Sequence, residues 1–249
     1  MSAKPMQTLA SQPDTESPLA EISRRTFWIF AILAFLSLAL FVFGKTYGQR
    51  MAFAGHVDDP TPIEVVIGND VMSIPINMVR LPDERQSGLT DTINLYVHWP
   101  TKQGFSVEHA DAFNNVGAGN AEIVFLSFRV RDRFLEMNER FEPVYTKAVD
   151  GPRRTIHDGL NVQALKPALG YNDEILVWAE ARNSIHPKFI ARCANAELET
   201  FIAPCETDLF VGRSLEMKAR FPQQMLQKWP TLNGELRAFA ASLQITPNR

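Results

Sequence analysis

An uninterrupted apolar stretch near the N-terminus restricts what this chain can become more than any other feature of its sequence. Residues 27–43 carry no charge and a single hydroxyl, that of Ser37. As a helix, the segment from Thr26 to Gly44 spans about 28 Å, close to the hydrocarbon core of a bilayer. A soluble helix rarely lacks a polar face over so many turns. The sequence therefore predicts a transmembrane anchor helix over residues 23–44, whose large aromatic side chains are Phe27, Trp28, Phe30, Phe35, Phe41 and Phe43.

A cleavable signal peptide is the alternative for this stretch. The small-x-small pattern that such a peptide needs is present at Ala52-Phe53-Ala54, so cleavage after Ala54 stays open. That pattern, however, lies well beyond Phe43, and the polar segment before the apolar stretch is long for a signal peptide. The sequence favours an uncleaved signal anchor. No cysteine follows the stretch closely, which argues against a lipoprotein anchor.

Charge and cysteine content indicate the side of the membrane on which each part lies. Basic residues before the stretch slightly outnumber those directly after it, which favours a cytoplasmic N-terminus. The chain has 2 cysteines, Cys193 and Cys205. Their spacing between strand-like segments is typical of a disulfide in an oxidising compartment, and two buried free thiols in a cytosolic domain are the alternative. Together these features predict an inner (plasma) membrane protein with a C-terminal domain outside the cytoplasm, in the periplasm of a bacterial cell.

The rest of the chain divides into a tail, a linker and one domain. Residues 1–22 are polar and predict a disordered cytoplasmic tail. Residues 45–62 form a juxtamembrane linker that ends in a proline-containing segment, and residues 63–249 form the extracytoplasmic domain. The formal net charge of −3 argues against nucleic acid as a partner, since nucleic-acid-binding proteins usually carry an excess of basic residues.

Alternating apolar and polar residues predict a mainly antiparallel sheet in this domain. A hairpin is expected from Ile63–Ile67, through a turn at residues 68–70, to Val71–Met78. Pro75 lacks a backbone donor, so the second arm of the hairpin is expected at a sheet edge. Further strands are expected at Thr92–Trp99, Glu122–Arg131, Glu174–Glu180, Lys188–Cys193, Thr200–Glu206 and Leu209–Arg220.

The strand expected at Thr92–Trp99 alternates cleanly, which is typical of a strand buried on one face. Tyr96 and His98 are expected on its solvent side. Helical spacing follows at Phe134, Met137 and Phe141, which predicts a short helix.

The C-terminal segment carries a longer apolar stripe with helical spacing. Pro230 lies within it and lacks a backbone donor, so the sequence predicts a kinked helix or two short ones. The stripe is expected to cover one face of the sheet, because two heptads are too few for a coiled coil. Its members are Met225, Trp229, Leu232, Leu236, Phe239 and Leu243.

No catalytic motif of known spacing occurs in the sequence. The chain lacks a G-x-S-x-G elbow, an H-E-x-x-H helix and an acidic calcium loop. Gly117-Ala118-Gly119 lacks the further glycine and the lysine of a phosphate-binding loop. The histidines have none of the spacings that usually supply two zinc ligands. The sequence therefore predicts neither a metal site nor a cofactor.

A few polar residues are candidates for a site built from distant parts of the chain. His98 and His109 are near enough in sequence to share a pocket, although a solvated polar face is the expected arrangement. His157 is followed by an aspartate, as in metal-dependent phosphohydrolases, but the rest of that motif is absent. Arg131 is the middle of three alternating arginines, whose charges nearby carboxylates are expected to neutralise.

Together these patterns predict an α+β domain: a mainly antiparallel sheet with a kinked C-terminal helix packed on it, behind one N-terminal transmembrane helix. The expected function is that of a single-pass envelope protein with a periplasmic binding or assembly domain. The expected partners are the lipid bilayer, through residues 26–44, and an envelope protein. Such a domain needs an exposed apolar or aromatic patch, which is expected near Tyr96, Trp99 and Phe105.

The alternative is a periplasmic hydrolase-type enzyme whose site is assembled from sequence-distant residues. Because no catalytic motif of known spacing occurs in the sequence, this is the less favoured hypothesis. Its catalytic candidates are His98, His109, His157 and Arg131.

Overall fold

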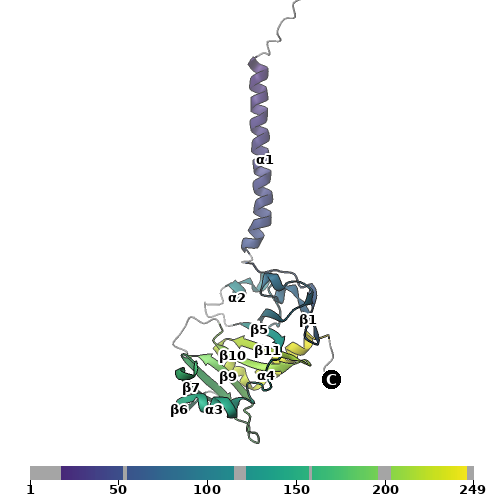
Figure 1. The fold of residues 1–249 in the computed structure, drawn as a ribbon. Coiled ribbons are helices and arrows are strands. Elements are labelled where there is room, and N and C mark those ends of the chain that lie inside the picture. Colours follow the sequence, from purple (N-terminus) through teal and green to yellow (C-terminus); the bar gives the residue numbers. More distant parts are fainter. Residues whose placement is uncertain (1–17, 53–54, 115–121, 157–158, 196–202, 246–249) are drawn as a thin grey trace, which may run out of the picture. The chain divides into compact units, whose positions relative to one another are not determined.

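Two units make up the structure, a computed structural model, and each is described separately (Figure 1). The first is Met1–Ala52 and the second is Phe53–Arg249. The structure describes the backbone of residues 18–52, 55–114, 122–156, 159–195 and 203–245.

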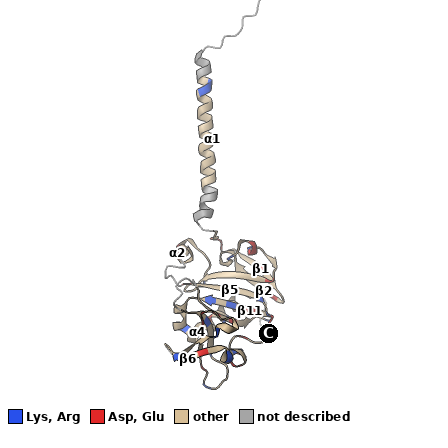
Figure 2. Ribbon diagram, turned by 60° about the vertical axis from the view of Figure 1, so that its left-hand side comes forward, with Lys and Arg blue, Asp and Glu red and all other residues tan. Residues whose placement is uncertain are grey.

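A single long helix, α1 (Pro18–Ala52), contains the apolar stretch. Its segment Ser23–Gly44 has a mean hydropathy of 2.5, and no part of its most apolar window is buried. Figure 2 shows this segment without charged residues, apart from basic ones near its N-terminal end. The predicted apolar helix is confirmed, and it is long enough to cross a membrane. Between 59% and 72% of the surface is exposed for each of Phe27, Trp28, Phe30, Phe35, Phe41 and Phe43.

A small sheet begins the second unit, with strands β1 (Pro62–Ile67), β2 (Asp70–Pro75) and β3 (Gly88–Leu89) in the order β2-β1-β3. β1 and β2 form the predicted antiparallel hairpin, and β2 lies at an edge, as Pro75 indicates. The second arm is shorter than expected, because Ile76–Met78 turns into a 3-10 helix after the proline.

The main sheet has eight strands in the order β4-β5-β11-β10-β9-β8-β7-β6. Every neighbouring pair is antiparallel, so the predicted α+β class with a mainly antiparallel sheet is confirmed. The strands are β4 (Thr92–His98), β5 (Ile123–Val130), β6 (Val149–Thr155), β7 (Leu160–Leu165), β8 (Glu174–Ala179), β9 (Phe189–Ala194), β10 (Cys205–Val211) and β11 (Leu215–Phe221).

Two local predictions within this unit are wrong, and two of its strands were not predicted. β10 continues to Val211, and the chain reverses at Gly212, whose φ of 62° suits glycine, so the expected strand boundaries around residues 206–209 are displaced. The strands β6 and β7 were not predicted. β6 is almost wholly exposed and has no apolar alternation, and β7 is buried at three consecutive residues, so it does not alternate either. The helix expected from Phe134 is also wrong: Phe134 is 97% exposed, and a short π-helical turn begins only at Phe141.

Helix α4 (Trp229–Ser242) covers one face of the main sheet, here called the inner face. It follows a 3-10 helix, Gln223–Lys228, and Pro230 lies in its first turn, where no backbone donor is needed. Leu232, Leu236 and Phe239 are buried in one core with the inward residues of β5, β9, β10 and β11 and with the β1–β2 hairpin. The predicted C-terminal helix on the sheet is confirmed, and Pro230 lies at the start of α4, directly after the 3-10 helix.

The predicted cysteine pair lies in the same core. Cys193 on β9 and Cys205 on β10 are register partners, and a disulfide joins them. The bond therefore links two neighbouring strands in the middle of the main sheet.

Two smaller apolar clusters cover the ends of the opposite, outer face. At one end the segment that contains α3 (Thr146–Ala148) packs over β7, β8 and β9. At the other end the segment that contains α2 (Ala110–Asn114) packs over β4 and β5. The buried members are Met137, Tyr145, Ala148, Leu165, Leu176, Trp178 and Ile190 in the first cluster, and Tyr96, Phe105, Ala112, Phe113 and Ile123 in the second.

The second cluster overturns one expectation about β4. Tyr96 and His98 are only 2% and 5% exposed, although the alternation of this strand places them on the solvent side. The alternation itself is correct, but residues 105–113 cover the face to which both side chains point. This end of β4 is therefore buried on both faces.

Candidate functional site

Between its two apolar clusters, the outer face of the main sheet is polar and forms a groove. The groove has a volume of about 670 Å³, within the range of small-molecule sites. Strands β4, β5, β11, β10, β9 and β8 all contribute to its lining, together with residues from the loops. We call it the outer-face groove. Its charged lining residues are Arg80, Asp173, Glu174, Arg192, Glu206, Lys218 and Arg220.

The antiparallel register sets the order of charges along the groove. Glu206 on β10 is the register partner of Arg192 on β9 and of Arg220 on β11. Asp208, two residues after Glu206 on β10, is the register partner of Lys218 on β11. Residues two apart on a strand share a face, so these five side chains project from the same side of the sheet. Acidic and basic groups thus alternate across three neighbouring strands.

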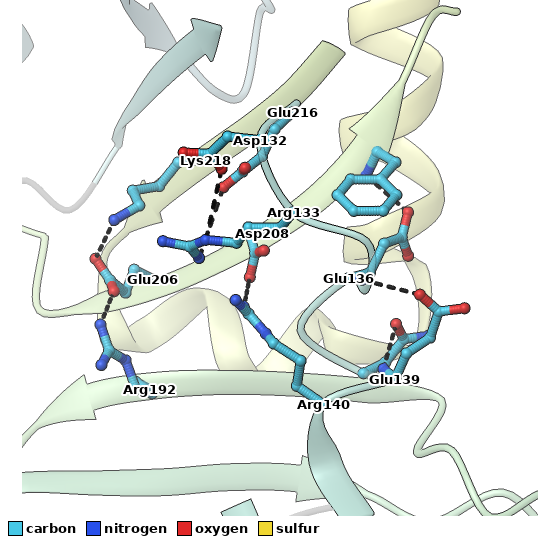
Figure 3. Close-up of polar contacts among 12 residues, drawn as sticks. Asp132, Arg133, Glu136, Glu139, Arg140, Arg192, Glu206, Asp208, Glu216 and Lys218 are labelled. Atoms are coloured by element: carbon cyan, nitrogen blue, oxygen red, sulfur yellow. Dashed lines mark hydrogen bonds and ion pairs between the residues drawn. The ribbon is translucent and has the colours of Figure 1, made fainter. Parts of the chain in front are cut away.

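Glu206 joins two of the basic residues (Figure 3). It accepts a hydrogen bond from Arg192, and its other oxygen lies 3.7 Å from the Nζ atom of Lys218. Burial disfavours the charged form of Glu206, but the hydrogen bond and charge of Arg192 outweigh burial and hold the pKa of this carboxyl below its ordinary value. Glu206 is therefore ionised at neutral pH and already paired.

A smaller cavity of about 240 Å³ shares Arg192, Glu206 and Lys218 with the groove. Asp208 lines this cavity, and its Oδ1 atom accepts a hydrogen bond of 2.5 Å from Arg140 (Figure 3). Its Oδ2 atom is buried and has no hydrogen-bond partner among the described residues. Burial raises the pKa of Asp208, although Arg140 opposes the shift.

Glu216 on β11 is the most deeply buried acid of the outer face. Its carboxylate lies 3.1 Å from an Nη atom of Arg129 on β5 and 3.8 Å from one of Arg133 in the following loop. An unpaired buried carboxylate would be costly, and the two guanidinium groups offset that cost. The carboxylates of Glu206, Asp208 and Glu216 on this face therefore all lie beside basic groups of the protein.

Two arginines that line the groove differ from the others. Arg80 places its guanidinium 5.6 Å from the centre of the Phe125 ring, and Arg220 is the register partner of Phe125. The guanidinium of Arg220 contacts a backbone carbonyl, that of Ala203, at 3.5 Å. Both arginines are exposed, and within the described part of the chain no carboxylate forms an ion pair with either. This end of the groove therefore has basic groups available to a ligand.

The groove is suited chemically to binding. No histidine is among its lining residues in the described part of the chain, and its cysteine, Cys193, is held in the disulfide. It offers guanidinium groups, carboxylates and the hydroxyl of Ser127 around the half-buried ring of Phe125. These groups can orient a polar molecule, whereas a nucleophile with an adjacent base is not among them.

The structure brings two of the catalytic candidates together. The ring centres of His98 and His109 lie 4.2 Å apart. His98 contacts the Thr101 hydroxyl at 2.8 Å and the Glu122 carboxylate at 3.2 Å, and His109 contacts the Ser106 hydroxyl at 2.9 Å. The expectation of a solvated face is wrong for His98, which is only 5% exposed, and neither histidine lines the outer-face groove.

The other two candidates do not join this pair. Arg131 follows the far end of β5, roughly 25 Å from the end that pairs with His98, and its guanidinium lies 4.7 Å from the ring centre of Phe210. His157 lies outside the described residues. Arg131 is therefore not part of a shared site with the histidines.

The predicted aromatic patch is also wrong. Tyr96, Trp99 and Phe105 are all buried, the first and third in the second cluster and Trp99 against Phe239 of α4. Only Tyr96 lies on the side of β4 that the alternation assigns to solvent, and Phe105 and Phe113 pack over it. Among the described residues, moreover, no group of three His, Cys, Asp or Glu side chains is placed to hold a metal ion.

Sequence reasoning missed every charged residue of the groove. A signal for some of them exists, since β10 and β11 carry charges two residues apart at Glu206 and Asp208 and at Glu216, Lys218 and Arg220. That pattern is also typical of an ordinary solvated strand face. Arg80 lies in a loop, and no local pattern relates it to the strands.

Comparisons with known proteins add little to this picture. No protein family matches the chain, and no curated protein is similar to it in sequence. Among solved structures, the Neisseria meningitidis iron-regulated outer membrane lipoprotein FrpD is similar with a TM-score of 0.41 and 9% identity, over 76% of this chain and 96% of that one. A similarity of this size carries no argument about the present protein.

Proposed function

We propose that this protein is a single-pass, membrane-anchored binding module of the inner (plasma) membrane, with its second unit outside the cytoplasm. In a bacterial cell with two membranes that unit lies in the periplasm and binds its partner or ligand there. The observation that carries the proposal is the apolar segment Ser23–Gly44, which has no buried residues in its most apolar window.

The exposed surface of this segment explains why a membrane is the expected environment. Large apolar side chains such as Phe35 and Leu40, which are 72% and 70% exposed, are unfavourable in water at roughly 25 cal/mol per Å². The segment has 22 residues, and a bilayer needs about 20. Lipid would remove nearly all of this apolar surface from water at once.

The disulfide supports the proposed compartment. Disulfides persist outside the reducing cytoplasm, and Cys193 and Cys205 are the chain's only cysteines. Arg24 and Arg25 at the N-terminal end of the span agree with a cytoplasmic N-terminus. The outer-face groove, which lacks a nucleophile–base pair among its described residues, supports binding as the role of the second unit.

The proposal is tested by expressing the full chain in a bacterium with two membranes. We expect the protein to stay with the inner-membrane fraction after alkaline carbonate washing, and added protease to degrade the second unit once the outer membrane is permeabilised. Denatured, unreduced protein should not react with maleimide. A chain in the soluble fraction, a protected second unit or two reactive thiols would each contradict the proposal.

A matched pair of variants separates membrane insertion from non-specific adsorption to the membrane. Replacing Phe35 and Leu36 with arginine adds about 6–8 kcal/mol to the cost of insertion and should release the protein from the membrane. Exchanging the two residues, Phe35→Leu with Leu36→Phe, leaves the composition unchanged and should leave the protein in the membrane.

A further inference from the structure

The basic end of the outer-face groove lies within an acidic protein. From Met51 onward the chain has 20 Lys and Arg against 25 Asp and Glu. The groove reverses this balance, since four basic residues and three acidic ones line it. Because Glu206 is already paired with Arg192 and Lys218, Arg80 and Arg220 are the basic lining groups that form no ion pair with a carboxylate among the described residues, although the charge of Arg220 also acts on Glu206. Excess positive charge is therefore concentrated at one end of a ligand-sized hollow.

These two arginines are placed next to one aromatic ring. The Arg80 guanidinium lies over Phe125, and Phe125 is directly opposite Arg220 in the β5–β11 register. A cation within about 6 Å of the centre of a ring is attracted to the face of that ring, and this attraction does not use the N–H groups of the guanidinium. Ser127, two residues along β5, adds a hydroxyl on the same face. The arrangement offers several hydrogen-bond donors beside a flat apolar surface.

We propose that the outer-face groove binds a small anionic molecule, whose carboxylate or phosphate group Arg80 and Arg220 hold beside Phe125. This inference specifies the ligand class of the binding module proposed above. Guanidinium groups recognise carboxylates and phosphates through paired, charge-assisted hydrogen bonds. The bound anion would provide Arg80 and Arg220 with the ion pair that no described carboxylate of the protein forms with them.

The other end of the groove limits the size of the anion. Asp173 and Glu174 line it beside β8, three strands from β11, which corresponds to about 14 Å. Glu174 lies 3.6 Å from Arg192, which partly neutralises it, whereas the carboxylate of Asp173 would repel a second, distant anionic group of the ligand. The groove therefore favours a compact anion over an extended polyanion, in agreement with the acidic balance of the whole chain.

The test uses the full-length protein in nanodiscs of phosphatidylcholine at low ionic strength. Inorganic phosphate and succinate serve as probes in calorimetric titrations. We expect at least one of them to bind, and Arg80→Gln and Arg220→Gln each to weaken that binding about tenfold, since each substitution removes a charge-assisted contact. Arg220→Lys, which keeps the charge, should weaken binding less than Arg220→Gln.

A matched control is available on the same protein. Arg131 also lies over a phenylalanine ring, that of Phe210, but it does not line the groove. Arg131→Gln should bind the probes as the unmodified protein does. If Arg131→Gln and Arg220→Gln weakened the affinity for the probes equally, net charge alone would govern binding, and the proposal would be overturned.

A second arm distinguishes a soluble anion from a lipid phosphate. Nanodiscs that contain phosphatidylglycerol should protect Leu215–Phe221 from hydrogen exchange only if a lipid headgroup occupies the groove, and Arg220→Gln should abolish that protection. Either probe binding or this protection supports the anion site, and the absence of both overturns it. Because both arms use purified protein, their outcome does not depend on the cellular topology that the proposed function requires.

Discussion

At the scale of single residues, each deeply buried carboxylate of the outer face lies beside a guanidinium group. Glu216 is neutralised by Arg129 and Arg133, and Asp208 by Arg140. An isolated buried charge is costly, so a carboxylate can be tolerated at these positions only while its basic partner is present. These pairs do not involve Arg80 or Arg220, which form no ion pair with a carboxylate among the described residues.

Replacing Glu206 with glutamine should show how much the ion pair between Glu206 and Arg192 contributes to stability at each pH. The pKa of Glu206 is lower in the folded protein than its ordinary value of 4.5, because the pairing with Arg192 outweighs burial. Its stabilisation is therefore fully present above about pH 4.5 and is lost as the pH falls through the folded-state pKa. Glu206→Gln should lower the free energy of unfolding by about 1–3 kcal/mol at pH 7.

Urea unfolding at several pH values provides the measurement. The difference between the unmodified protein and Glu206→Gln should shrink steadily below pH 4.5. Glu108→Gln, at an exposed position, is the control and should change stability little at any pH. A difference that stays constant down to pH 3 would show that the ion pair is not its source.

At the scale of elements, one buried aspartate connects the small sheet to the main sheet. Asp70, at the start of β2, is completely buried and accepts hydrogen bonds from the backbone N–H groups of Arg213 and Ser214 and from the Ser214 hydroxyl, at 2.8 to 2.9 Å. These donors belong to the turn between β10 and β11. Gly212 is needed in that turn, because a Cβ atom there would lie 2.5 Å from the Asp70 carboxylate.

Removing the Asp70 carboxylate should loosen this connection. Asp70→Ala leaves two backbone N–H groups without their acceptor, and we expect it to lower the free energy of unfolding by about 2–4 kcal/mol. Hydrogen exchange should accelerate most at Arg213 and Ser214. Asp83→Ala, at an exposed position in a 3-10 turn, is the control. Equal effects of the two substitutions would contradict a specific role for Asp70.

Elements were predictable from the sequence wherever their own residues carry the signal. The hairpin, β4, β5 and the C-terminal helix all show the expected period over at least six residues. β6 shows none, because its Arg153 and Arg154 are exposed and packing does not select the residues of that strand. Phe134 has helical spacing with Met137, yet only Met137 is buried, so the apparent period does not correspond to a helix face.

At the scale of the whole molecule, the three apolar clusters of the second unit are built from its own residues. All their members lie between Ile63 and Leu243, and none comes from the first unit. The unit therefore has the core that a domain needs in order to fold by itself.

A fragment of residues 55–249 should accordingly fold without the helix. We expect its thermal midpoint, followed by near-ultraviolet circular dichroism, to lie within about 3 °C of that of the full chain in detergent, because no buried cluster is lost. The fragment should also stay soluble without detergent. A midpoint lower by 10 °C or more would show that the first unit contributes to the core of the second.

The sequence by itself determined the features that depend on neighbouring residues: the apolar helix, the alternating strands, the C-terminal stripe and the cysteine pair. Periodicity and hydropathy are local properties, so one chain is enough to recognise them. Only the tertiary structure decided that residues 105–113 bury Tyr96 and His98, and that Arg80, Phe125 and Arg220 meet in one groove. Those outcomes depend on strand register and on which segments cover a face, and both arise from contacts between residues far apart in the chain.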